Sequence, residues 1–403
     1  MRRRVSLLAA AVLTAAFLCA PSGTAASADP VPGPAAQWRQ LAVDALAKFE
    51  TFDHTAIGGA PSVNGCGPGY PGVTQRVAAY AWAAQAAGIL RGWHDPTTTA
   101  YLNKMLSMKN PDGGYGLPCD YDQFNDGSVN PKTTSYTVTM AGHVGQTEIA
   151  AYEAGVLPAS ELSALAVEVK AVPQLNNAAG SCLAYSTAAP DHANPDYCVH
   201  NVNAGAAVFL MQVQALELAP AGSGILAGYI GRRETATYNV HTGSWPYDDS
   251  GRASDDGHTA YLVASMYYLA PYLGNFIAGN LLAKTYTAAA DWGVTLGLAA
   301  LPSDVAGMHY GPPDRWCAGA ARQIPLQQQT LATWTTPDVA NVLAQAAQLF
   351  AVAAAACAPY DPPVTPTTTA PTTPPASPTP STTAPSPSPS TEPTPSESTP
   401  PIG

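Results

Sequence analysis

The feature that most constrains this chain is a regular alternation between long, turn-rich loops and unusually apolar helical segments. Five loops, rich in Gly, Pro, Asn, Asp and aromatic residues, span 51–72, 109–133, 173–200, 240–254 and 297–336. An apolar segment with helical periodicity follows each loop, beginning near residues 73, 134, 201, 255 and 337. The interval of roughly sixty to eighty residues holds one pair of helices per repeat, which predicts an array of helical hairpins.

The same periodicity predicts ten helices and few strands. They are expected over 35–50, 73–91, 97–108, 134–155, 158–172, 201–217, 222–239, 255–273, 278–296 and 337–356. Segments that follow a long loop carry few charges, whereas the others carry groups such as Arg232, Arg233 and Glu234. This difference predicts buried inner helices and amphipathic outer helices. We therefore expect an all-α domain, a ring of five or six helical hairpins with the long loops at one end.

The two ends of the chain have compositions that differ from this pattern. Residues 1–28 carry Arg2 to Arg4, an apolar run and a small-residue cleavage site, which is typical of a secretory signal. Residues 361–403 contain 15 Pro and 19 Ser or Thr among 43 residues, too polar to fold and typical of a disordered tail. We therefore expect export, with the tail either free or associated with the cell wall, and one folded domain over 29–360.

Charge and cysteine content restrict the partners. The formal net charge is −11, which argues against nucleic acid as a partner, and no apolar run outside the signal suits a membrane span. We expect a monomer. Of the seven cysteines, six lie outside the expected signal; an even number in an exported chain favours disulfides, and 15 connectivities are open. We favour the sequential pairs Cys66–Cys119, Cys182–Cys198 and Cys317–Cys357.

Residues His258 to Ala270, preceded by Asp255 and Asp256, resemble the inner-helix signature of the α/α-toroid superfamily. The segments 110–116 and 242–247 look like its glycine-aromatic turns. This superfamily includes terpene cyclases, the β subunits of protein prenyltransferases and complement-type thioester domains. The resemblance implies a closed ring of helices. It does not extend to terpene-cyclase chemistry, because Ala253 stands where the family's first catalytic Asp is expected.

A metal site is one reading of the polar residues. Asp196 and Cys198, followed by His258, are similar to the Asp-x-Cys…His zinc triad of the prenyltransferase β subunits, which implies zinc on these three side chains. The alternative is a disulfide between Cys198 and Cys182, which removes the thiolate ligand. A further group with oxygen ligands that suit calcium lies in loop 109–133: Asp122, Asn125 and Asp126. We favour the disulfide and expect no cofactor.

A carbohydrate site is the other reading, because aromatic faces and carboxyl groups gather in the loops of an exported chain. Acid–base chemistry on a glycan needs a base and an acid near the bond that is broken. The candidate catalytic residues are His258, Asp256, Asp249, Tyr261 and His200. The candidate substrate-binding residues are Trp245, Tyr247, Asp248, Arg252, Asn201 and Asn203.

The expected partner is an extracellular polysaccharide or cell-wall glycan. A glycoside hydrolase, polysaccharide lyase or epimerase is the leading interpretation. A non-catalytic glycan-binding module and a prenyltransferase-like zinc enzyme are the alternatives. A structural role stays open for each residue, since Asp256 sits where it can cap a helix and Trp245 can pack a turn.

Overall fold

The computed structural model describes residues 33–52, 76–117, 120–122, 124, 126–178, 180–191, 197–239, 245–254, 256–273, 313–336 and 340–361. The expected signal peptide, Cys66, Cys119 and nearly all of the expected tail lie outside these residues. The helices are α1 (Pro34–Phe52), α2 (Arg76–Arg91), α3 (Pro96–Leu106), the π-helix η3 (Val138–Val144), α4 (Gly145–Glu153), α5 (Ala159–Ala171), α6 (His200–Ala215), α7 (Ser223–Thr237), α8 (Asp256–Leu273), α11 (Pro313–Thr333) and α12 (Ala340–Cys357). The described fold is mostly helical, as predicted.

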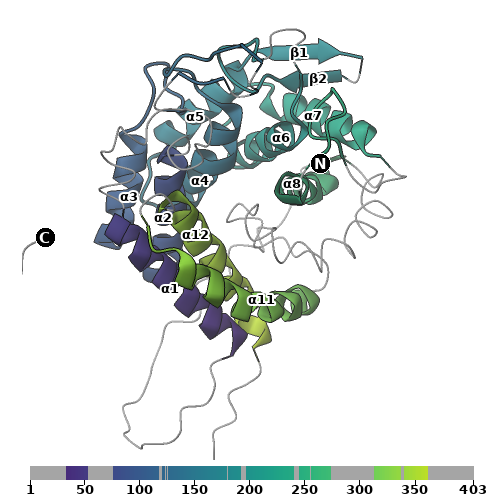
Figure 1. Cartoon of the computed structure of the whole chain (residues 1–403). Coiled ribbons are helices and arrows are strands. Elements are labelled where there is room, and N and C mark those ends of the chain that lie inside the picture. Colours follow the sequence, from purple (N-terminus) through teal and green to yellow (C-terminus); the bar gives the residue numbers. More distant parts are fainter. Residues whose placement is uncertain are drawn as a thin grey trace, which may run out of the picture. The chain divides into compact units, whose positions relative to one another are not determined.

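Two series of helices alternate along the chain and differ in burial. In the first series α12 contacts α2, α2 contacts η3, η3 contacts α6, and α6 contacts α8. In the second series α1 packs on α12, α3 on α2, α5 on α4 and α7 on α6; Figure 1 shows α1 beside α12 and α7 beside α6. α6 is buried on nearly every side, whereas α5 buries one stripe from Leu162 to Val169. The predicted split into apolar and amphipathic helices is therefore present.

A row of buried amide side chains links α12, α2, α4 (the continuation of η3) and α6. Gln348 on α12 donates to Gln85 on α2 (3.0 Å), and Gln85 donates to Thr147 on α4 (2.6 Å). Gln146, also on α4, donates to Gln212 on α6 (2.8 Å). Buried amides must be hydrogen-bonded to avoid a large desolvation cost. These bonds therefore restrict how one helix can slide along the next.

The first and last helices are tied together. The Asp361 carboxylate accepts hydrogen bonds from the Ala35 backbone N–H at 3.0 and 3.2 Å, so it caps the start of α1 from a position far along the chain. A disulfide joins Cys317 on α11 to Cys357 on α12, as predicted. Asp361 thus belongs to the folded domain. The boundary expected from composition had placed it in the tail.

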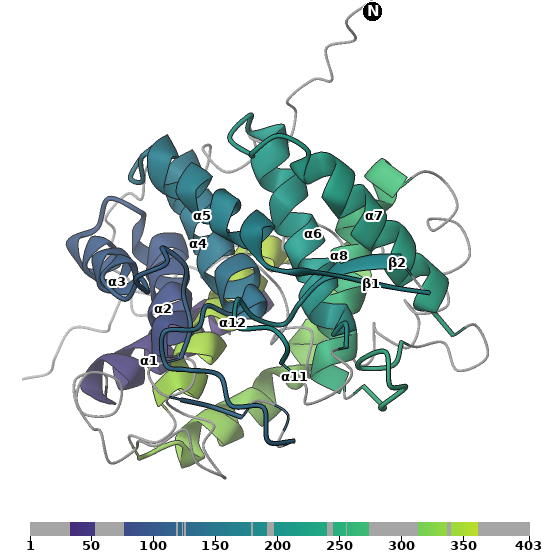
Figure 2. The same cartoon turned by 90° about the horizontal axis from the view of Figure 1, so that it is seen from above.

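Three local details differ from the sequence-based expectation. Loop 173–200 contains an antiparallel hairpin of β1 (Gln174–Asn177) and β2 (Gly180–Leu183), which pairs Leu175 with Cys182 and runs beside α7 in Figure 2. Loop 297–336 contains α11, which buries Ala320, Ile324 and Leu331 on one face. This helix continues through an internal Pro325. The expected helix 134–155 begins as a π-helix, which sequence periodicity does not distinguish.

One stretch within the described residues, Val342–Tyr360, is long and apolar enough in composition to cross a membrane. Most of this stretch is buried inside the fold, and its helix α12 packs against α1 and α2. Core helices of soluble proteins share this composition. The apolar character of α12 is therefore explained by its place in the core.

Candidate functional site

Two loop–helix junctions repeat the same backbone arrangement. At the first, Tyr136 and Ser186 form an isolated antiparallel β-bridge. The Thr137 N–H donates to the Tyr185 carbonyl (2.9 Å), and the Thr187 N–H donates to the Ser135 carbonyl (2.9 Å). We call this set the hydroxyl junction. It places the end of one long loop against a segment of the next, directly before η3.

The second junction has the same hydrogen bonds with different side chains. Val199 bridges Asp248, the His200 N–H donates to the Tyr247 carbonyl (3.0 Å), and the Asp249 N–H donates to the Cys198 carbonyl (3.2 Å). Each residue follows its counterpart by 62 or 63 positions, within the predicted repeat interval. We call this set the ionic junction, because His200 and Asp249 occupy the positions of Thr137 and Thr187.

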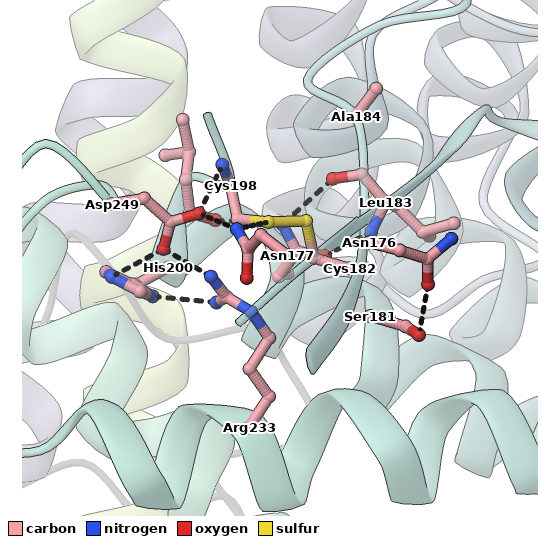
Figure 3. Close-up of a disulfide and its surroundings, with 12 residues drawn as sticks. Asn176, Asn177, Ser181, Cys182, Leu183, Ala184, Cys198, His200, Arg233 and Asp249 are labelled. Carbon is pink, nitrogen blue, oxygen red and sulfur yellow. Dashed lines mark hydrogen bonds and ion pairs between the residues drawn. A yellow bond between two sulfur atoms is a disulfide. The ribbon is translucent and has the colours of Figure 1, made fainter. Parts of the chain in front are cut away.

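The ionic junction is the centre of a buried network of charges, and Figure 3 shows three of its members, His200, Arg233 and Asp249. His200 Nδ1 lies 2.7 Å from Glu234 Oε2, and Arg233 Nη1 lies 2.9 Å from Glu234 Oε1. Arg233 Nη2 contacts Asp249 Oδ1, and His200 Nε2 lies 3.8 Å from the same oxygen. The side chains of His200, Arg233 and Glu234 are at most 1% exposed, and that of Asp249 is 15% exposed. Buried charges of this kind persist only when they are paired.

Neighbouring groups hold the network in place. The Asp249 carboxylate accepts hydrogen bonds from Asn177 Nδ2 (2.6 Å) and from the Cys198 N–H (3.1 Å). The Cys182–Cys198 disulfide ties β2 to the start of α6, as predicted. Trp245 Nε1 donates to the Glu234 carbonyl (2.7 Å). The loop 245–254 is therefore anchored at both Trp245 and Asp249.

The chemistry open to His200 follows from these contacts. Nδ1 is closest to the Glu234 carboxylate, and a carboxylate in that position orients an imidazole and favours its N–H toward the acid. However, the imidazole is 1% exposed, so no substrate reaches Nε2 in this arrangement. The network therefore acts on the loops that it joins, and not directly on a ligand.

An aromatic cluster lies beside the two junctions. Its members come from three loop segments and pack on one another: Tyr121, Phe124, Tyr136, Tyr185 and Tyr247. The Tyr185 ring contacts Phe124 edge-on (5.1 Å) and Tyr136 edge-on (5.7 Å). Burial raises the pKa of the Tyr185 hydroxyl well above its usual value. Tyr121, Phe124 and Tyr247 are half-buried, so the cluster is partly open to solvent.

Arg252 and His258 flank this cluster. The Arg252 guanidinium lies 4.2 Å from the centroid of Tyr247 and 5.7 Å from that of Phe124. The His258 ring meets Tyr247 edge-on at 4.9 Å. Arg252 also pairs with Asp248 (2.9 Å), whose other oxygen accepts a hydrogen bond from the Ser250 N–H. Tyr247 thus contacts both a cation and an imidazole.

The structure separates several residues that the sequence hypothesis grouped around His258. Asp249, expected as its carboxylate partner, is held by Arg233 and Asn177 beside His200. Tyr261 extends from α8 toward the backbone of η3 and α6, where an added Cβ at Gly142 or Gly205 would meet its hydroxyl at 2.7 or 2.2 Å. Burial raises the pKa of that hydroxyl.

The remaining candidates have different environments. Asn203 has a structural role, since its amide exchanges hydrogen bonds with the Leu183 backbone at 2.7 and 3.0 Å. Asn201 is buried, and its Oδ1 accepts no hydrogen bond from a described residue. Asp256 begins α8, but its side chain lies outside the described residues.

The zinc hypothesis is wrong for Cys198. Its sulfur is bonded to Cys182, so it cannot supply a thiolate, and the described residues contain no group of three His, Cys, Asp or Glu side chains arranged to hold a metal. Asp196 and Asn125 lie outside the described residues. In the loop with candidate calcium ligands, Asp122 accepts hydrogen bonds from the Asp126 and Gly127 N–H groups, at 3.1 and 2.8 Å, and so stabilises a turn.

Sequence reasoning missed Arg233 and Glu234, because charges on an amphipathic helix are usually solvent-exposed. It also missed Glu148, which is fully buried on α4. Tyr115 donates to Glu148 Oε1 (3.2 Å), while Oε2 has no hydrogen-bond partner among the described residues. Desolvation raises the Glu148 pKa to about 8. The run of three charges from Arg232 to Glu234 was the available signal for the network.

Comparison of the chain with protein-family models, with curated proteins and with solved structures finds no match.

Proposed function

We propose that this chain is an exported α/α-toroid protein that binds extracellular glycan at the aromatic cluster. The observation that carries the proposal is the group of half-buried rings flanked by Arg252 and His258. Aromatic faces pack well against the apolar faces of sugar rings, and neighbouring polar groups supply hydrogen bonds to hydroxyls. The ionic junction fixes the loop that supplies Tyr247 and Arg252.

The toroid is supported by the order of helix contacts. The buried helices α12, α2, η3, α6 and α8 contact one another in succession, and a second helix packs outside most of them. The buried amides from Gln348 to Gln212 follow the same succession. A ring in which hairpins are added one after another produces this order of contacts.

Export is supported by two features. The first is the composition of residues 1–28, which is typical of a secretory signal. The second is the pair of disulfides, Cys182–Cys198 and Cys317–Cys357, because disulfides persist mainly in oxidising compartments. An extracellular location would bring the aromatic cluster into contact with polysaccharides.

Catalysis on the bound glycan is the second candidate function. It is favoured by the position of His258 and Tyr261 on successive turns of α8, with His258 in contact with the cluster. Burial raises the pKa of Tyr261 and makes its hydroxyl a weak acid, so His258 is the stronger catalytic candidate of the two. His258 would then be the base of a hydrolase, lyase or epimerase.

A polysaccharide panel tests both candidates. Purified protein from residue 29 onward is titrated against soluble neutral and acidic polysaccharides by calorimetry, and the same mixtures are assayed for new reducing ends and for the absorbance of unsaturated products. Binding without products supports a binding module, and binding with products supports an enzyme. Absence of binding across the panel would overturn the proposal.

A further inference from the structure

Arg252 differs from an ordinary surface arginine in how firmly it is held. Its guanidinium lies over two aromatic rings, Tyr247 and Phe124, and its Nη2 pairs with Asp248. A free arginine loses considerable rotamer entropy when it binds a ligand. Here that loss has already occurred on folding, so the guanidinium is preorganised for a ligand.

At this ion pair the Arg252 cation is exposed to solvent and the Asp248 anion is buried. The Arg252 side chain is 48% exposed, whereas the Asp248 side chain beneath it is 2% exposed. The buried Asp248 Oδ1 is also engaged by the Ser250 N–H at 3.0 Å. A ligand that approaches the aromatic cluster therefore meets a guanidinium face before it meets a carboxylate.

The acidic residues of the neighbouring loop are occupied by backbone hydrogen bonds. Asp120 accepts from the Lys132 N–H (2.8 Å), and Asp122 accepts from two N–H groups of its own turn. These bonds disperse part of their negative charge. In the part of the chain that the structure describes, Arg252 is the cation that contacts rings of the aromatic cluster.

A planar guanidinium pairs best with a planar carboxylate, through two parallel hydrogen bonds. We infer that Arg252 is a specificity-determining residue that binds the carboxylate of a uronic-acid unit while adjacent sugar rings pack on the aromatic cluster. This inference rests on the proposed function and narrows it to acidic glycans.

The test compares each acidic glycan with its own neutral form. Polygalacturonate, alginate and hyaluronan are titrated into the protein beside carboxyl-reduced preparations of the same polymers. At least one acidic form should bind ten-fold or more tightly than its reduced form. Added salt should diminish that preference, because the contact is electrostatic and partly exposed.

Two substitutions at the ion pair have opposite expected effects. Arg252→Gln should remove the preference for the acidic form, so that the acidic and reduced forms of one polymer bind with affinities within about two-fold of each other. Asp248→Asn keeps an oxygen acceptor for Ser250 but removes the competing charge, so it should increase the preference. Arg232→Gln is the matched control, because Arg232 also lies over an exposed tyrosine, Tyr229, at 4.8 Å but on α7. Thermal unfolding of each variant confirms that it folds.

The outcomes separate this inference from the proposed function. If acidic and reduced forms bind equally, or if folded Arg252→Gln keeps the preference, the carboxylate assignment is wrong and glycan binding still stands. If neither form of any polymer binds, and the neutral panel also fails, the proposed function itself is wrong.

Discussion

The hydroxyl junction and the ionic junction have the same backbone and almost opposite side-chain chemistry. Both pair one residue before a buried helix with a residue of the following loop, through two main-chain hydrogen bonds of 2.9 to 3.2 Å. At the first, the Thr137 hydroxyl donates to the Ala184 carbonyl and the Ser135 hydroxyl donates to Asp112, both at 2.8 Å. At the second, His200 and Asp249 join Arg233 and Glu234 in a buried network.

The comparison shows that the shared backbone does not depend on buried charges. Main-chain bonds and a few hydroxyl groups maintain it at the hydroxyl junction. Burying four ionisable groups carries a desolvation penalty that pairing roughly offsets. What the ionic junction adds is a rigid connection between β1, α6, α7 and the loop 245–254, which supplies two groups of the proposed glycan site.

The largest expected effect comes from breaking the network at its most buried carboxylate. Glu234→Ala leaves the buried Arg233 cation with one fewer anion and removes the carboxylate beside His200 Nδ1. The free energy of unfolding should fall by about 3–5 kcal/mol, measured by urea denaturation. Glu50→Ala is the control, since Glu50 forms a partly exposed pair with Arg91 (3.0 Å) and should change stability by less than about 1 kcal/mol. Equal losses of stability in the two variants would contradict the distinction between the buried network and an exposed ion pair.

Glu148 and Glu234 sharpen the comparison, because both are buried but only Glu234 has an arginine beside it. The Glu148 pKa is raised to about 8 in the folded state, from an ordinary value of 4.5. The folded state therefore binds a proton that the unfolded state releases. The stabilisation of the folded state by this bound proton is complete below pH 4.5. It is lost as pH rises to 8, at about 1.4 kcal/mol per pH unit.

Stability measured by denaturation should thus decline by up to about 4 kcal/mol between pH 5 and pH 8 from this group. Glu148→Gln retains an acceptor for Tyr115 and should flatten the decline, whatever its effect on absolute stability. A variant profile that remains parallel to the wild-type profile would show that Glu148 does not titrate in this range.

The disulfide is a third difference, because Ser135 stands at the hydroxyl junction where Cys198 stands at the ionic one. Cys182 and Cys198 are separated by 16 residues, and closing a loop of this length stabilises a fold by about 3 kcal/mol through the unfolded chain. Replacing both cysteines with serine should lower the free energy of unfolding by that amount. A loss below about 1 kcal/mol would mean that the network alone holds this connection.

The smallest effect is expected at the hydroxyl junction. Thr137→Val keeps the shape of the side chain but removes the buried hydrogen bond to the Ala184 carbonyl, so stability should fall by about 1 kcal/mol. Thr51→Val on the exposed surface of α1 removes a similar bond to Ala47 (3.0 Å) and should have a smaller effect. A loss at Thr137 as large as that of Glu234→Ala would remove the contrast between the junctions.

Much of the fold was predictable from the sequence, because local patterns determine it. The start of α6 was expected at Asn201 and lies at His200, and two cysteine pairs were correctly assigned. α11 was missed because Pro325 and several glutamines obscure its apolar stripe. The loop 173–200 conceals a hairpin whose strands lack a continuous apolar pattern.

The site was predictable only in part, because it depends on contacts between distant segments. His200 and Asp249 were both selected as candidates, but nothing local indicates that a bridge between Val199 and Asp248 brings them together. Arg233 and Glu234 sit on a helix beside the exposed Arg232, so their burial follows from tertiary packing and not from the local sequence. The role of Tyr247 between Arg252 and His258 also depends on how the loop folds back.

The central claim is that glycan binds at the aromatic cluster held by the ionic junction. The most direct test titrates the tightest-binding polysaccharide of the panel into wild type, Tyr247→Ala and Tyr229→Ala, the last removing a 54% exposed tyrosine on α7. Tyr247→Ala should weaken binding ten-fold or more, equivalent to about 1.4 kcal/mol, while Tyr229→Ala binds like wild type. A folded Tyr247→Ala variant with wild-type affinity would contradict the claim.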